Sequence, residues 1–419
     1  MTRTAVIHPN LRERNQRRTP DLALDEAINL SQAIDLKVVS SQVVPVPKPR
    51  AGTLFGLGKV DELGAAFAAD DIDLVIIDGK VTPIQQRNLE KTWDIKILDR
   101  TGLILEIFSE RAATREGVLQ VDLAHLNYQK SRLVRSWTHL ERQRGGLGFI
   151  GGPGETQIES DRRALSEHIT RIKKQLSKVV KTRALHRASR AKVPYPIVAL
   201  VGYTNAGKST IFNKITGAKV MAKDMLFATL DPTMRAIDLP SGRKVILSDT
   251  VGFISDLPTQ LVAAFRATLE EVLDADLVLH IRDISHPETR EQARDVQEIL
   301  TEIGISDVAQ ENMLEVWNKV DNLPSKQATA IRTSAKRDIK TWATSAITGE
   351  GLDALYDAIE NALADPVIEE EVFLPFNKGK ARAWLFANNA VVSEKLIKDG
   401  YKIHLSWTEK TRNQFAAIG

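Results

Sequence analysis

The stretch Val198-Ala-Leu-Val-Gly-Tyr-Thr-Asn-Ala-Gly-Lys-Ser-Thr210 determines how the central part of this chain folds. It carries the pattern Gly202-x-x-x-x-Gly207-Lys208-Ser209, with an apolar strand before it and a helical run after it. Glycines at both ends leave the backbone N–H groups open to phosphate oxygens, and the start of the next helix also attracts anions. The pattern predicts a phosphate-binding loop in which Lys208 reaches the β- and γ-phosphates and Ser209 binds Mg²⁺.

The segment Asp249-Thr-Val-Gly252 follows a second apolar strand. This short pattern is weak evidence alone, but its place at a strand end after a phosphate-binding loop strengthens it. A carboxylate there can hold Mg²⁺ through water, and the Gly252 N–H can donate to the γ-phosphate. The next residue is Phe253, where many GTPases have the glutamine that orients the attacking water. We therefore expect slow intrinsic hydrolysis, with the water positioned by another group or by a partner.

The segment Asn318-Lys-Val-Asp321 closes another apolar strand. Guanine presents N1–H and an N2 amine on one edge, and the Asp321 carboxylate can accept from both. Adenine lacks these two donors and would leave the carboxylate unpaired, which is costly in a buried site. The Lys319 stem can cover the face of the base, and backbone N–H groups of Ser345-Ala-Ile347 can donate to the guanine O6. This order of motifs predicts GTP and GDP as ligands.

The segment Phe227-Ala-Thr-Leu-Asp-Pro-Thr-Met-Arg235 lies between the phosphate-binding loop and Asp249. A switch loop needs a hydroxyl that closes on Mg²⁺ when the γ-phosphate is present. Thr229 and Thr233 both meet this need, and we favour Thr229. Asn205 resembles the asparagine of potassium-stimulated GTPases, which implies that K⁺ can neutralise γ-phosphate charge here.

These motifs define three sets of predicted site residues. The nucleotide-binding set is Gly202, Tyr203, Thr204, Asn205, Ala206, Gly207, Lys208, Ser209, Thr210, Phe227, Ala228, Thr229, Leu230, Asp231, Asp249, Thr250, Val251, Gly252, Asn318, Lys319, Val320, Asp321, Ser345, Ala346 and Ile347. The predicted metal ligands are Ser209 and Thr229. The predicted catalytic residues are Lys208, Thr229 and Gly252.

The composition of the 419-residue chain limits its class. Apolar residues make up 43%, which is enough for several packed domains. The chain has no cysteine, so disulfides and thiolate metal sites are excluded, in agreement with a cytoplasmic location. No apolar run reaches the length of a membrane span. Residues 1–20 contain arginines but no apolar core, so we expect a basic tail, with an organelle transit peptide as the alternative.

Residues 21–114 alternate between helical and strand patterns, which predicts a small α/β domain with a short parallel sheet. The expected strands are 36–44, 74–78 and 95–98. Thr82-Pro83 is a helix start, because a capping residue precedes a proline. Gly56-Leu-Gly58-Lys59 lacks the spacing of a phosphate-binding loop and is interpreted as a turn before a helix.

Residues 115–192 have the apolar spacing of two long amphipathic helices with a coiled-coil-like seam. The seam residues are Leu119, Leu123, Leu126, Lys130, Leu133, Trp137 and Leu140 in the first helix and Leu165, Ile169, Ile172, Leu176 and Val179 in the second. The segment carries 17 Lys and Arg residues against 7 Asp and Glu. This excess fits a nucleic-acid partner, and a solvated charged face is the alternative.

The connection between the two helices, residues 145–154, is long and glycine-rich and carries Leu147, Phe149 and Ile150. Antiparallel helices need only a short loop, so this segment is either a plain connector or a probe that inserts into a partner. Arg142 and Arg144 beside it favour an RNA partner. The predicted RNA-binding residues are therefore Arg142, Arg144 and Phe149.

The predicted fold class is α/β, centred on a P-loop GTPase domain over residues 197–364 with a mostly parallel sheet and helices on both faces. The small α/β domain and the antiparallel helical hairpin precede it. A linker at 365–371 leads to a small α/β C-terminal domain over residues 372–419, in which no chemistry can be identified.

At these motifs the chain resembles the HflX family of translational GTPases, in the Obg-like branch. The resemblance covers nearly the whole chain. The residues that carry it are the loop Gly202–Ser209, Phe227–Thr233, Asp249–Ile254, Gly117–Ala124 and Gly152–Glu155.

The resemblance implies a monomeric GTP hydrolase that binds the large ribosomal subunit and its rRNA and splits or rescues stalled ribosomes. It also implies secondary ATP hydrolysis through the N-terminal half, although no second nucleotide motif is present. Two alternatives stay open. One is a GTPase that assists ribosome assembly or RNA modification, and the other is a GTP-dependent switch for a protein partner.

Overall fold

The computed structural model describes residues 1–11, 18–143, 153–190, 195–218, 226–227, 233–256, 272–305, 310, 312–364 and 367–416. The chain divides into two compact units, residues 1–356 and 357–419. Among the described residues, no helix combines the length and the apolar character that crossing a bilayer requires.

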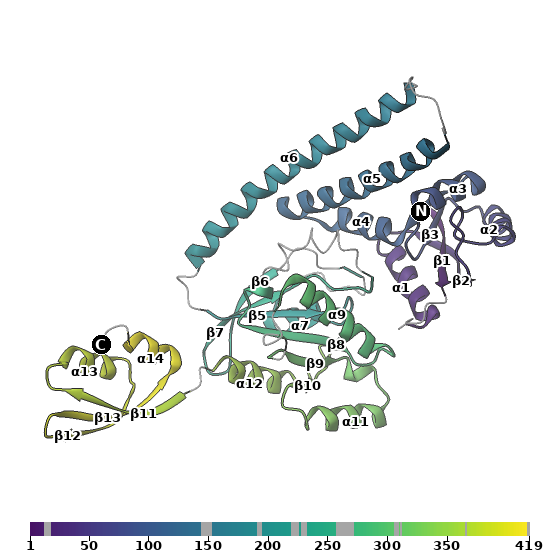
Figure 1. Ribbon diagram of the computed structural model, residues 1–419. Coiled ribbons are helices and arrows are strands. Elements are labelled where there is room, and N and C mark those ends of the chain that lie inside the picture. The colour runs from purple at the N-terminus through teal and green to yellow at the C-terminus, as the bar shows by residue number, and fades with distance from the viewer. Residues whose placement is uncertain are drawn as a thin grey trace. The chain divides into compact units, whose positions relative to one another are not determined.

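The N-terminal part of the first unit is a four-stranded parallel sheet in the order β2-β1-β3-β4, with helices packed around it (Figure 1). Its elements are β1 (Arg3–Leu11), α1 (Pro20–Gln32), β2 (Lys37–Val46), α2 (Leu57–Ala69), β3 (Leu74–Ile77), α3 (Pro83–Trp93), β4 (Lys96–Asp99) and α4 (Arg100–Arg111). Thr82 starts α3 as predicted, because its hydroxyl accepts from the Gln85 N–H while the Gln85 side chain accepts from the Thr82 N–H.

The expected basic tail over residues 1–20 is wrong for the start of the chain. Residues 3–11 form β1, which pairs with β2 on one side and with β3 on the other. Ala5, Val6 and Ile7 are at most 1% exposed. Three apolar residues are enough for this strand because both of its faces are covered.

Two long helices, α5 (Arg115–Gln143) and α6 (Pro153–Arg190), follow and pack along each other as a hairpin (Figure 1). Ile169 and Ile172 of α6 are buried, as the seam pattern predicts. α6 already begins at Pro153, so the connecting loop is shorter than expected. That loop, residues 144–152, lies outside the described residues.

The first helix of the hairpin is fixed to the N-terminal sheet at the end of β4. The Tyr128 hydroxyl donates to the Asp99 carboxylate at 2.8 Å, and the Arg132 guanidinium donates to the other Asp99 oxygen. The Gly102 N–H also donates to Asp99, at 2.8 Å. This buried carboxylate therefore joins the start of α4 to the side of α5.

The part of the first unit that follows the hairpin is a six-stranded sheet in the order β10-β9-β8-β5-β7-β6, parallel except for the edge strand β6 (Figure 1). Its elements are β5 (Ile197–Gly202), α7 (Lys208–Thr216), β6 (Thr233–Asp238), β7 (Lys244–Asp249), β8 (Leu277–Asp283), α9 (Thr289–Ile303), β9 (Leu314–Asn318), the 3-10 helix η1 (Val320–Asn322), α11 (Ser325–Ala335), β10 (Thr341–Ala343) and α12 (Leu352–Leu363). The predicted mostly parallel α/β fold is confirmed.

The second unit contains an antiparallel sheet in the order β11-β13-β12. Its elements are β11 (Val367–Pro375), α13 (Gly379–Ala387), β12 (Val391–Ile397), β13 (Gly400–Thr408) and α14 (Glu409–Ala416). The linker expected at residues 365–371 is wrong from Val367 onward, because β11 begins there. Acidic side chains suit this strand since they pair across it, as Glu371 does with Lys402 at 2.6 Å.

Candidate active site

The phosphate-binding loop joins the central strand β5 to the helix α7, at the carboxyl edge of the six-stranded sheet. This is where doubly wound parallel sheets bind their ligands. Gly207 has a φ of 95°, and a Cβ atom there would lie 2.2 Å from Asn318 Nδ2. A Cβ on Gly202 would lie 2.1 Å from the Ile281 carbonyl oxygen. Both glycines are therefore required by conformation and by close approach.

Lys208 is buried within this loop, and its Nζ donates to the carbonyl oxygens of Gly202 at 3.1 Å and Tyr203 at 2.8 Å. Burial lowers the pKa of Lys208 to about 8; the nearby Asp249 carboxylate opposes this change and Lys319 adds to it. Burial disfavours the charged form of the lysine, so an anion beside it stabilises that form strongly. The lysine is thus prepared to receive phosphate oxygens.

Two hard oxygen groups lie together beside the lysine. Ser209 Oγ donates to an Asp249 carboxylate oxygen at 2.7 Å. A hydroxyl and a carboxylate are ligands that suit Mg²⁺, which usually keeps several waters and takes its remaining ligands from nucleotide phosphates. These two residues are the ones that would hold the ion, directly or through water.

The segment after Asp249 passes close to the loop. A Cβ on Gly252 would lie 2.8 Å from Thr204 Cγ2 and 3.1 Å from Lys208 Nζ, so only glycine fits there. Its N–H is therefore carried close to the lysine that would contact the γ-phosphate. The Phe253 side chain is 1% exposed and cannot reach a water in the site.

The base-binding motifs are joined to the phosphate-binding loop through Asn318. Its side chain donates to the Ala206 carbonyl oxygen at 2.9 Å and accepts from the Ala346 N–H at 3.0 Å. Lys319 has a φ of 63°, and its Nζ lies 2.9 Å from an Asp283 oxygen. Asp321 is exposed on η1, where a base could reach its carboxylate. The structure therefore brings the predicted loop, Asn318 and Ser345–Ile347 into one site.

Some predicted residues are placed elsewhere or not at all. The Phe227 ring packs edge-to-face on Phe108 of α4, with ring centres 4.6 Å apart, and is 2% exposed. Ala228, Thr229, Leu230 and Asp231 lie outside the described residues, as do Arg144 and Phe149. Arg142 belongs to α5, but its side chain is not described.

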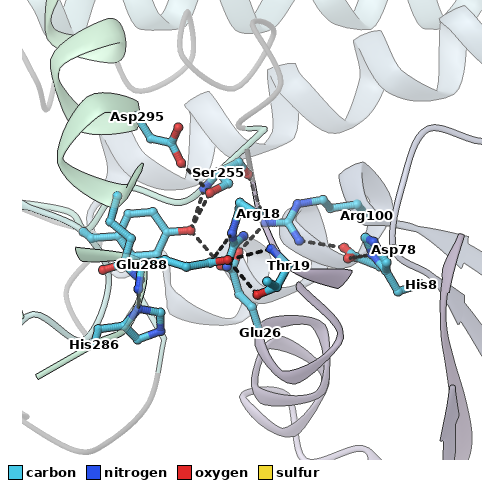
Figure 2. A network of polar contacts seen from close by, with 12 residues as sticks. His8, Arg18, Thr19, Glu26, Asp78, Arg100, Ser255, His286, Glu288 and Asp295 are labelled. Carbon is cyan, nitrogen blue, oxygen red and sulfur yellow. Dashed lines mark hydrogen bonds and ion pairs between the residues drawn. The ribbon is translucent and has the colours of Figure 1, made fainter. Parts of the chain in front are cut away.

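A buried polar network that the sequence did not predict joins this site to the N-terminal sheet (Figure 2). Arg100 is at its centre and donates to Asp78 at 2.6 Å, to the Ser255 carbonyl oxygen at 2.9 Å and to Glu26. The Tyr203 hydroxyl donates to Glu26 Oε2 at 2.6 Å and accepts from the Ser255 N–H at 2.8 Å.

The network continues on both sides. Arg18 pairs with Glu26 at 2.8 Å and with Glu288 at 3.0 Å, and the Thr19 N–H donates to Glu288 at 2.7 Å. At the other end, His8 Nδ1 lies 2.8 Å from Asp78 Oδ2 (Figure 2).

Charge and burial set the protonation of these groups. Arg100 and the His8 hydrogen bond hold the pKa of Asp78 below its ordinary value, although burial opposes this. Burial and the neighbouring Glu26 raise the pKa of Tyr203 well above its ordinary value. Tyr203 therefore keeps its proton and can act as a donor to Glu26.

The fold and this site define a P-loop GTPase, an enzyme that hydrolyses GTP. Comparison with protein families agrees in each part of the chain. The matching models are described as "GTP-binding GTPase N-terminal" over residues 21–109, "GTP-binding GTPase Middle Region" over 111–190, "50S ribosome-binding GTPase" over 197–319 and "HflX C-terminal domain" over 330–415.

Individual relatives identify the family. GTPase HflX of Magnetococcus marinus is 51% identical over 377 residues, which cover 90% of this chain and 85% of the relative. GTPase HflX of Escherichia coli is 43% identical over 382 residues, which cover 91% and 88%. The chain belongs to the HflX GTPase family. Among solved structures, a complex of SsGBP with GDP aligns with 86% of this chain and 98% of its own at 25% identity and a TM-score of 0.49.

Proposed function

We propose that this GTPase is a Mg²⁺-dependent switch that binds the large ribosomal subunit through its helical hairpin and splits or rescues stalled ribosomes. The observation that carries this proposal is the charge of residues 115–192, with 17 Lys and Arg against 7 Asp and Glu in a chain whose overall charge is only +3. Such a local excess suits a phosphate backbone.

The described part of α6 supports this proposal. Its basic side chains between residues 162 and 178 are all exposed: Arg162, Arg163, Arg171, Lys173, Lys174 and Lys178. Ile169 and Ile172, between them, are buried. The helix therefore packs through an apolar stripe and exposes these basic side chains on its other face.

The anchored base of the hairpin also supports a role in binding. Asp99 holds both Tyr128 and Arg132 of α5, so the hairpin is attached firmly to the N-terminal sheet. A firmly attached arm loses less conformational entropy when it binds than a mobile arm. The family model that matches residues 197–319 is described as "50S ribosome-binding GTPase", which points to the same partner.

We assign Mg²⁺ to the site of Ser209 and Asp249, with Thr229 as the further ligand from the switch loop. Asn205 is exposed in the phosphate-binding loop at a φ of 57°. Its amide oxygen is a suitable ligand for K⁺ beside the nucleotide, and replacement of K⁺ by Na⁺ should then slow hydrolysis without loss of GTP affinity.

Sedimentation of the full chain with ribosomal subunits tests the proposal. We expect the protein to pellet with the large subunit when a non-hydrolysable GTP analogue is bound and much less when GDP is bound. Equal distribution in the two nucleotide states would contradict a nucleotide-controlled switch. Binding only to precursor particles, or only to a protein partner, would favour assembly or protein signalling instead.

Charge reversal distinguishes the contribution of the hairpin to subunit binding from the general electrostatic attraction of the protein. In Lys173→Glu with Lys174→Glu, we expect weaker subunit binding and a shallower dependence of affinity on salt, by about one unit of slope for each phosphate that is no longer neutralised. Lys336→Glu with Arg337→Glu is the matched control, since both residues are also neighbouring and exposed but follow α11. Equal weakening in both variants would remove the hairpin from the proposal.

The tip of the hairpin is tested by replacing residues 145–152 with a short Gly-Ser turn. GTP binding should remain intact, while ribosome-stimulated hydrolysis should fall. Phe149→Ala alone should weaken binding by about 1–3 kcal/mol if its ring stacks on an unpaired base. Arg142→Ala with Arg144→Ala should instead reduce the salt dependence. Wild-type affinity and stimulation after tip replacement would make this segment a connector only.

A further inference from the structure

Many GTPases carry a glutamine directly after this glycine, Gly252 here, and that glutamine orients the attacking water. Phe253 occupies the next position, and its ring is turned into the core. The segment that carries the Gly252 N–H is held instead by contacts to the backbone of residues 253–255.

Those contacts come from the phosphate-binding loop itself. The Phe253 N–H donates to the Gly202 carbonyl oxygen at 3.1 Å, and the Thr204 N–H donates to the Phe253 carbonyl oxygen at 2.7 Å. These two bonds fix the backbone of Phe253 to the phosphate-binding loop. The next fixed point is the Ser255 N–H, which donates to the Tyr203 hydroxyl at 2.8 Å.

Tyr203 contacts both Lys208 and the segment that follows Gly252. Its carbonyl oxygen accepts from Lys208 Nζ at 2.8 Å, and its hydroxyl holds Ser255. The hydroxyl is 2.6 Å from Glu26 Oε2, to which it donates. Because its proton is directed to Glu26, its oxygen is left as the acceptor for the Ser255 N–H.

The N-terminal sheet fixes the same residue from the other side. Arg100 donates to the Ser255 carbonyl oxygen at 2.9 Å and also pairs with Glu26. Both polar backbone groups of Ser255 are thus held by side chains that share one carboxylate. We propose that Tyr203 is a positioning residue for GTP hydrolysis, which holds the segment after Gly252 against the phosphate site with Glu26 and Arg100 as its supports.

The variant Tyr203→Phe removes the hydroxyl and keeps the ring. We expect kcat for GTP hydrolysis to fall about tenfold, as the loss of one buried hydrogen bond in the transition state predicts. The Kd values for GTP and GDP should stay within about twofold, because the backbone carbonyl that contacts Lys208 remains.

Ser31→Ala is the control. It also removes a buried hydroxyl that donates a hydrogen bond at 2.8 Å, but the acceptor is the Ala27 carbonyl oxygen within α1. Its kcat should equal that of the wild type. An unchanged kcat in Tyr203→Phe, or an equal fall in both variants, would overturn the proposal, as would a Tyr203→Phe defect confined to nucleotide affinity.

Glu26→Gln provides an independent route if Tyr203→Phe does not fold. It keeps the size of the side chain and weakens the acceptor of the Tyr203 proton, so kcat should fall in the same direction. Where both variants fold, the double variant should lose less than the product of the two single effects, because both act through Ser255. A fully multiplicative loss would show that Glu26 and Tyr203 act separately and would contradict the proposal.

Discussion

The two parallel sheets of the first unit use their carboxyl edges in different ways. At the edge of the six-stranded sheet, glycines and the buried Lys208 form the phosphate-binding loop. At the edge of the four-stranded sheet, Arg100 pairs with Asp78 and with Glu26. The order β2-β1-β3-β4 reverses direction between β1 and β3, which is where such sheets commonly bind ligands.

The difference follows from how charge is satisfied. Lys208 is buried with carbonyl oxygens as its hydrogen-bond acceptors, so it gains from an anionic ligand. Arg100 already has two carboxylates and a carbonyl, so its charge is neutralised within the protein. The carboxyl edge of the six-stranded sheet thus becomes a ligand site. The carboxyl edge of the four-stranded sheet becomes an internal contact to the GTPase part.

The largest effect should follow removal of Arg100. Arg100→Ala leaves Asp78 and Glu26 buried without their cation, so the free energy of unfolding should fall by about 3–5 kcal/mol. Urea denaturation measures this. Arg332→Ala is the control, because Arg332 also contacts a carboxylate, Glu350, but on the exposed surface, where no measurable loss is expected. Similar losses of unfolding free energy in both variants would contradict the difference between the buried and the exposed ion pairs.

Removal of Lys208 should weaken nucleotide binding rather than folding stability. Lys208→Ala should weaken GTP binding about a hundredfold, close to 3 kcal/mol, with little loss of folding stability. Ser209→Ala should mainly reduce the Mg²⁺ dependence of binding. Calorimetry with and without Mg²⁺ distinguishes the two variants. Unchanged GTP affinity in Lys208→Ala would withdraw the phosphate-site assignment.

The base pocket should respond by a smaller change in preference. Asp321→Asn offers a donor where guanine needs an acceptor, so the variant should lose about 1–3 kcal/mol of GTP binding and gain affinity for xanthosine triphosphate. Competition of the two nucleotides for one labelled ligand measures the preference. A variant that keeps the wild-type preference for GTP would exclude Asp321 from base recognition.

The smallest effect should come from pH. In the nucleotide-free protein the pKa of Lys208 is about 8, so the side chain is charged below this pH and neutral above it. GTP binding requires the charged form, so affinity should be constant below pH 8 and fall as pH rises, by about tenfold at pH 9. Proton uptake should accompany binding near pH 8. Affinity that stays constant up to about pH 9.5 would contradict the role of Lys208.

The sequence predicts the parts of the ligand site because each part is marked by residues that are neighbours along the chain. The loop at 202–209, Asp249 and Asn318 each stand at the end of an apolar strand, and parallel strands bring their carboxyl ends together. The network could not be predicted in this way. Glu26 and Tyr203 are 177 residues apart, and neither has a spacing that marks it as buried.

Other differences have the same physical origin. The arginines near the start of the chain favour a tail, although Ala5-Val-Ile7 is a short apolar signal for β1. The neighbours of Phe227 in sequence indicate nucleotide binding, but its ring packs on Phe108 instead. Tertiary contacts decided both positions.

The central claim is that Glu26 and Arg100, which belong to the N-terminal part of the chain, hold the segment that follows Gly252. Amide hydrogen exchange of a peptide covering residues 250–256 tests this most directly, in the full-length protein and in Glu26→Gln. The wild-type peptide should exchange slowly, and the variant peptide at least about tenfold faster, while peptides from α11 stay unchanged. Equal exchange of residues 250–256 in both proteins, with the variant still folded by circular dichroism, would contradict the claim.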